Sequence, residues 1–119
     1  MGYRSNVAIK CEEKAYEMFK QVFAKKEMWI MPDKIYKDEN CYIILWLWVK
    51  WYGCEVVDEI TNVMDKLNDN GNETGGYGYK FVRIGEEYDD TEIISNDENI
   101  DLWIIHEIDI PDNLEEIKI

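Results

Sequence analysis

The stretch CYIILWLWVKWY at residues 41–52 decides the fold, because it contains the longest apolar run of the chain. Its β-branched and aromatic side chains favour a strand, and the run is too short to cross a bilayer. Alternation gives one face with Ile43, Leu45, Leu47, Val49 and Trp51, and another with Tyr42, Ile44, Trp46, Trp48, Lys50 and Tyr52. Because both faces are mainly apolar, we expect this strand near the centre of a sheet.

The segments before this stretch predict a strand, a helix and a hairpin. Residues 5–11 alternate between apolar and polar side chains and predict a strand. Residues 12–26 carry apolar side chains at helical spacing, with acidic residues first and basic residues last, as the helix macrodipole favours. After Pro32, a polar turn at 38–40 separates a short predicted strand at 33–37 from the long one, so the two strands should form a hairpin.

The segments after the stretch predict a helix, two strands and two connections. Residues 55–68 carry apolar side chains at a spacing of 3.6 and predict a second amphipathic helix. A glycine-rich loop leads from this helix to a predicted strand at 77–84. Residues 86–101 are predicted to be an acidic connection, and the alternation at residues 102–110 predicts a last strand that ends before Pro111.

This order of elements predicts one α+β domain over residues 1–119. We expect a ferredoxin-like βαββαβ sandwich, with two helices on one face of an antiparallel sheet and an additional C-terminal strand. The aliphatic face of residues 41–52 should pack under the helices, which leaves Trp46 and Trp48 on the opposite face. That face is open unless a partner, a second copy of the chain or the C-terminal segment covers it. An open apolar face predicts a homodimer or higher assembly through pairing of faces or edges.

The charge of the chain is concentrated in its second half. Residues 1–50 hold 9 basic and 7 acidic side chains, a net of +2, whereas residues 51–119 hold 4 basic and 19 acidic side chains, a net of −15. No Lys or Arg lies between Arg83 and Lys118. This balance disfavours direct binding to nucleic acid or to an anionic membrane, and it allows a partner protein with a basic surface.

An apolar anchor beside a charged region is typical of a protein-binding surface. The acidic segment at 86–101 and the aromatic strand face supply these two features. The predicted partner-binding residues are Glu86, Glu87, Asp89, Asp90, Glu92, Asp97, Glu98, Trp46 and Trp48.

The residues that carry most enzyme and metal chemistry show no matching pattern. His106 is the only histidine, and Cys11, Cys41 and Cys54 are widely spaced, so we predict no metal, no cofactor and no catalytic site. The glycines before Lys80 run into a strand, so they do not form a phosphate loop. An odd number of cysteines and the lack of a signal peptide predict free thiols in a cytoplasm.

Three segments carry a resemblance to a known group of proteins. They are MGYRSNVAIK at residues 1–10, WVKWY at residues 48–52 and YGYKFVRIGEEYDD at residues 77–90. The chain resembles small bacteriophage and prophage proteins that begin MGYRS. This resemblance implies the cytoplasm of a bacterial host as the setting. Small acidic phage proteins also resemble inhibitors of host defence, including anti-CRISPR proteins.

Together these features predict a non-enzymatic phage protein that inhibits a host defence complex. Its acidic surface would compete for a groove that binds nucleic acid. The alternative is a small-ligand binder that sequesters a nucleotide defence signal, with a base stacked on the aromatic face and a phosphate bound by Arg83 or Lys80. A structural or regulatory phage module is the third hypothesis.

Overall fold

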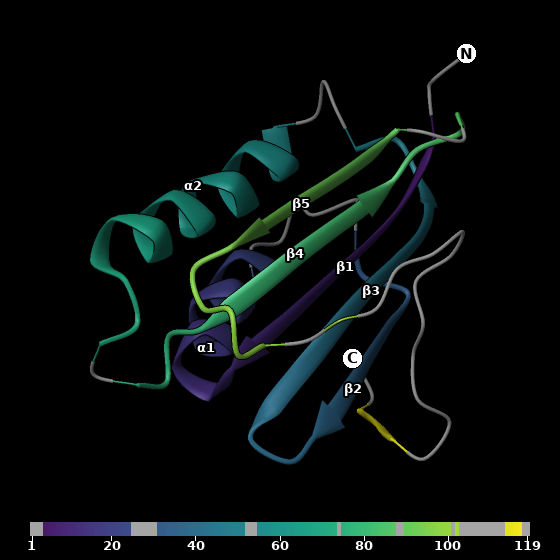
Figure 1. The fold of residues 1–119 in the computed structure, drawn as a ribbon. Coiled ribbons are helices and arrows are strands. Elements are labelled where there is room, and N and C mark those ends of the chain that lie inside the picture. The colour runs from purple at the N-terminus through teal and green to yellow at the C-terminus, as the bar shows by residue number, and fades with distance from the viewer. Residues whose placement is uncertain are drawn as a thin grey trace.

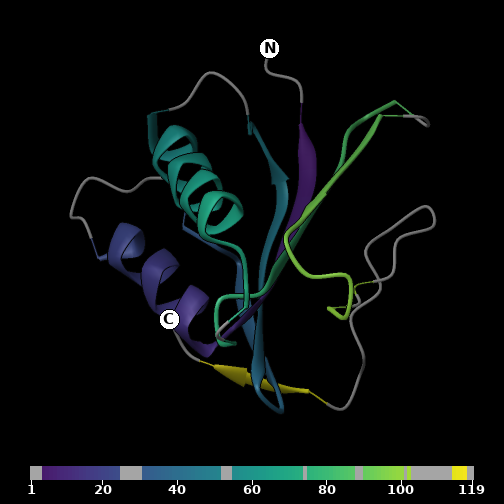
Figure 2. The same cartoon turned by 60° about the vertical axis from the view of Figure 1, so that its left-hand side comes forward.

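The computed structural model describes residues 4–24, 31–51, 55–73, 75–87, 90–100, 102 and 114–117. Within these ranges the chain forms two helices and an antiparallel sheet of six strands, in the order β5-β4-β1-β3-β2-β6 (Figure 1). The elements are β1 (Ser5–Glu12), α1 (Glu13–Phe23), β2 (Lys34–Asp38), β3 (Cys41–Val49), α2 (Glu55–Asn70), β4 (Tyr79–Ile84), β5 (Thr91–Ser95) and β6 (Glu115–Ile117). The α+β prediction is confirmed, with both helices on one side of the sheet (Figure 2).

The main core lies between the sheet and the two helices. Phe19 of α1, Ile60 of α2 and Ile9 of β1 are all completely or almost completely buried there. Each helix contributes the apolar stripe that its spacing predicted, and burial of these side chains is the main favourable term for folding.

The predicted assignment of faces in β3 is wrong. Trp46 is fully buried under the helices, where its ring meets Phe23 and Trp51 edge-on at centroid distances of 5.9 and 5.2 Å. Ile43 and Leu45 lie on the opposite face instead. The large indole ring fills the space between the sheet and the helix layer. It buries more of its surface there than it could under the thinner cover of the other face.

That opposite face is covered in part by the C-terminal third of the chain. Leu102 is 4% exposed and packs with Ile43, Leu45 and Val82. Leu114 lies against the same cluster. Within the described residues, these contacts cover the apolar face on which the homodimer prediction was based.

A β-bulge in β3 explains why Trp46 and Trp51 share one side of the sheet. Val7 of β1 pairs with Trp46, but Ser5 pairs with Val49, so β3 contains one extra residue opposite β1. The extra residue reverses the alternation of the strand. Trp51 therefore lies on the helix side of the sheet, whereas strict alternation from Trp46 would place it on the opposite side.

Two strands differ from the sequence-based predictions. β5 (Thr91–Ser95) lies within residues 86–101, so the prediction of a connection throughout that segment is wrong. β6 (Glu115–Ile117) was not predicted, because a strand of three residues is too short to give a periodic signal. Of the strand predicted at 102–110, only Leu102 lies within the described residues, and it is not part of a strand.

Candidate functional site

The bulge presents two large apolar side chains to the surface. Leu47 is 47% exposed and Trp48 is 60% exposed, although both belong to the most apolar strand of the chain. Met31, which lies shortly before the start of β2 at the same end of the sheet, is 39% exposed. Large apolar side chains exposed near one end of a sheet are candidates for a contact surface.

Side chains from two other segments hold the bulge in place. Asn6 of β1 accepts a hydrogen bond from the backbone N–H of Trp48 at 2.8 Å, and Asp33 accepts one from the N–H of Leu47 at 2.6 Å. Trp48 has a φ of 55°. A non-glycine residue in this region costs on the order of 1 kcal/mol or more, so the surrounding contacts must impose the conformation.

The bulge lies at the same end of the sheet as the turn between β4 and β5. Asn6, opposite the bulge, pairs with Ile84 of β4, and Ile84 pairs with Thr91 of β5. These pairs form one row across the sheet, and three strand spacings separate Trp48 from Thr91, a distance of roughly 14 Å. Both features therefore fit within the footprint of one partner protein.

Arg83 anchors the turn between β4 and β5. Its guanidinium is almost fully buried and makes a two-pronged contact with Asp90, at 2.7 and 3.1 Å. It also donates hydrogen bonds to Glu92 at 3.1 Å and to Ser5 at 3.0 Å. Asp90 and Glu92, both predicted partner-binding residues, are thus engaged within the protein itself.

Among the described residues of the turn, Glu86 and Glu87 carry exposed side chains. The turn is closed by hydrogen bonds from the Gly85 N–H to the Asp90 carbonyl at 2.8 Å and from the Asp90 N–H to the Glu87 carbonyl at 3.1 Å. Asp89 lies outside the described residues. We call the region formed by Met31, Leu47, Trp48, Glu86 and Glu87 the bulge end of the sheet.

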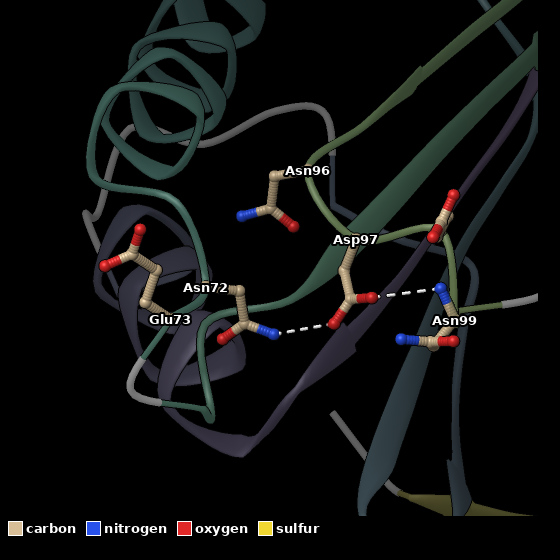
Figure 3. A pocket seen from close by; sticks show the side chains of 6 residues that line it. Asn72, Glu73, Asn96, Asp97 and Asn99 are labelled. Carbon is tan, nitrogen blue, oxygen red and sulfur yellow. Dashed lines mark hydrogen bonds between the residues drawn. The ribbon is translucent and has the colours of Figure 1, made fainter.

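Asp97 and Glu98 lie at the other end of β5, beside an open hollow of about 530 Å³ (Figure 3). Asp97 accepts hydrogen bonds from the backbone N–H of Asn99 at 2.9 Å and from the Asn72 side chain at 2.7 Å. These bonds lower the pKa of Asp97 below its ordinary value. The predicted acidic surface is therefore divided between the two ends of β5 rather than continuous.

The hydrogen bonds around this hollow fasten the loop after α2 to β1. Asn72 also donates to Glu12 at 2.7 Å, and the same Glu12 oxygen accepts the Gly78 N–H at 3.0 Å. A Cβ atom on Gly78 would lie 2.5 Å from the side-chain ends of both Glu12 and Ile100, so a larger residue there would displace the Glu12 carboxylate from its hydrogen bonds. The glycine-rich stretch connects α2 to β4, as its sequence indicated, and it is packed against Glu12 and Ile100 at Gly78.

The thiols within the described residues are poorly suited to nucleophilic chemistry. Burial raises the pKa of the Cys11 thiol well above its ordinary value, and burial also raises that of Cys41. The reactive thiolate is therefore disfavoured at neutral pH. His106 and Cys54 lie outside the described residues. Across the part of the chain that is described, no three His, Cys, Asp or Glu side chains converge to hold a metal ion.

Of the residues suggested for nucleotide binding, only Trp48 and Lys80 are accessible, and they lie on different strands. Trp46 is buried beneath the helices, and Arg83 is engaged by Asp90, Glu92 and Ser5. Lys80 is partly exposed on β4, opposite Ser95. These residues therefore do not place a stacking surface beside a cation that could bind a phosphate.

Sequence reasoning named Trp48, Glu86 and Glu87 as candidates, but it missed the bulge that brings out Leu47. One signal was present: Trp46 and Trp51 are separated by an odd number of positions, so strict alternation could not bury both on the same face.

None of the helices in the described part is long and apolar enough to cross a membrane. No protein-family model, no curated protein and no solved structure matches this chain.

Proposed function

We propose that this chain is a non-enzymatic phage protein that binds a basic host protein through the bulge end of the sheet. The observation that carries the proposal is the row that aligns exposed Trp48 with the acidic turn at Glu86 and Glu87. An exposed tryptophan gives a large contact area with little loss of side-chain freedom, and nearby carboxylates steer a basic partner toward it.

The strain at Trp48 supports the same interpretation. The left-handed backbone conformation at Trp48 brings no packing gain to its own side chain, most of which is in solvent, although the bulge also returns Trp51 to the core. Such strain is often kept where a side chain must be presented in one direction. The hydrogen bonds that Asn6 and Asp33 accept from the N–H groups of Trp48 and Leu47 fix that direction before a partner arrives.

The partner that fits the negative charge of this turn is a protein with a basic groove that normally binds nucleic acid. Carboxylates on the turn would occupy the positions in that groove that normally bind phosphates, so binding would inhibit the partner. The resemblance to phage proteins supplies the setting, a defence complex in the cytoplasm of a bacterial host. We also propose that β1 to β4 with the two helices form a ferredoxin-like unit, which the order β4-β1-β3-β2 supports.

The experiment combines affinity capture from a bacterial lysate with displacement of labelled nucleic acid from the captured complex. Wild type is compared with Glu86→Lys combined with Glu87→Lys. The matched control is Asp58→Lys combined with Asp65→Lys, because both residues are exposed on α2 and the change in charge is the same. Asp90 is left intact so that the Arg83 contacts persist.

We expect wild type to capture the complex at about 50 mM salt and to lose it progressively toward about 500 mM. The variant at residues 86 and 87 should displace nucleic acid at least about tenfold more weakly, whereas the α2 variant should match wild type. Equal displacement by all three proteins would contradict the proposal. Equal losses in both variants would show that net charge, and not the bulge end, determines binding.

A further inference from the structure

We infer that β5 binds an extended, Lys- or Arg-flanked segment of the partner as an additional strand of the sheet. The inference rests on the proposed function in one respect, that the partner is basic. It concerns the outer edge of β5, which forms one border of the sheet (Figure 1) and begins just after the acidic turn at Glu86 and Glu87.

The register shows which backbone groups face outward. The Gly85 N–H bonds the Asp90 carbonyl, and the Asn96 N–H bonds the Tyr79 carbonyl, at the two ends of the β4–β5 ladder. Alternation between these bonds directs the N–H and C=O groups of residues 92 and 94 toward β4. The corresponding groups of Thr91, Ile93 and Ser95 therefore point away from the sheet, and all three residues are exposed.

This edge lacks the features that usually protect an exposed strand. β5 contains no proline, no lysine and no bulge, and its only charged residue, Glu92, is bonded to Arg83. Ile93 is 52% exposed in the middle of the strand. An edge of this kind provides backbone hydrogen bonds for a partner strand and one apolar contact at its centre.

The charges around β5 favour a basic occupant. Exposed acids flank both ends of the strand, with Glu86 and Glu87 before it and Glu98 after it. The other possible occupant is a second copy of this chain. Antiparallel pairing of two β5 strands about Ile93 would bring the turn of one copy beside Glu98 of the other, where like charges repel.

The test uses the full chain and the peptide KKTVTVTKK as the probe. Binding is followed by fluorescence polarisation, and amide hydrogen exchange reports on each residue of β5. We expect saturable binding below about 1 mM and new protection at residues 91, 93 and 95. The peptide EETVTVTEE should bind at least about tenfold more weakly.

Two further probes test the backbone contact directly. The Ile93→Pro variant removes an outward N–H and leaves the β4–β5 bonds intact, so it should lose at least about tenfold in affinity. Ile93→Thr, which keeps the N–H, should lose less. On the wild-type protein, KKTVTVTKK with N-methyl groups on its five central residues should not bind, and this result does not depend on the folding of any variant.

Several results would overturn the inference. These are no binding of KKTVTVTKK, equal binding of its N-methylated form, or protection confined to the bulge end. Protection of residues 91, 93 and 95 without peptide would also overturn it, and sedimentation would then assign the cover to a dimer or to the chain itself. Failure here leaves the capture experiment with Glu86→Lys and Glu87→Lys unaffected, so the two proposals can fail separately.

Discussion

Trp48 is the residue whose substitution should most clearly weaken binding without changing stability. In Trp48→Gly, relief of the positive φ and loss of partial burial should roughly offset, so the free energy of unfolding should change by less than about 1 kcal/mol. Affinity for the captured host protein should fall at least about tenfold. Chemical denaturation and a binding titration measure the two effects.

The matched control is the buried neighbour. Trp46→Leu removes core volume and should lower the free energy of unfolding by about 2 kcal/mol or more. A large loss of stability in Trp48→Gly with unchanged binding would assign Trp48 a structural role and remove it from the bulge end.

Arg83 tests whether the acidic turn is held from within. Arg83→Met leaves Asp90 and Glu92 close together without their shared cation, so the free energy of unfolding should fall by about 2–3 kcal/mol. Arg83→Lys keeps the charge but loses the two-pronged geometry, and its loss should be smaller. Urea titrations of the three proteins decide this, and identical midpoints would show that the contacts add no stability.

Tyr79 predicts how stability responds to alkaline pH. Burial raises the pKa of Tyr79 to about 12. The unfolded chain therefore loses this proton first, near pH 10, and stability falls as pH rises from about 10 to about 12. The contribution of Tyr79 to this loss should be roughly 2 kcal/mol.

Tyr79→Phe isolates that contribution from the other groups that titrate in the same range. The variant should be less stable than wild type at pH 9, because Asn68 loses its donor, and the difference should shrink toward pH 11.5. A constant difference between the two proteins across this range would contradict the assignment.

At the scale of elements, the bulge in β3 depends on contacts that are distant in sequence. Asn6→Ala should remove the acceptor for the Trp48 N–H, and Asp33→Ala the acceptor for the Leu47 N–H, each at a cost of about 1 kcal/mol. Amide exchange should accelerate at Trp48 in the first variant and at Leu47 in the second. Each variant is the control of the other, and acceleration at both amides in both variants would indicate general loosening of β3.

The same element shows where prediction from sequence ends. Periodicity located β3 and both helices to within a few residues, because their apolar stripes are long. It could not assign the faces of β3 because both faces are apolar, and it could not place Trp51 because the bulge is fixed by Asn6 and Asp33. β5 was missed because Glu92 looks like a solvated charge until its contact with Arg83 is known.

At the scale of the whole molecule, the predicted acidic region is resolved into parts with different roles. Asp90 and Glu92 stabilise a turn, Asp97 belongs to a network that joins two loops, and Glu86 and Glu87 remain exposed. Charge counting along the sequence could not separate these roles, because each depends on which partners the fold supplies. The homodimer prediction has lost its main support, since Leu102 and Leu114 lie on the apolar face that had argued for it.

The central claim is that the apolar and acidic parts of the bulge end act on one partner. The most direct test is a titration of the captured host protein with wild type, Trp48→Gly, the Glu86→Lys and Glu87→Lys variant, and all three substitutions together. We expect each of the first two variants to lower the affinity for the same protein at least about tenfold, with reduced salt dependence only where the charges are reversed. Unchanged affinity in all four titrations, or loss of two different partners, would contradict the claim.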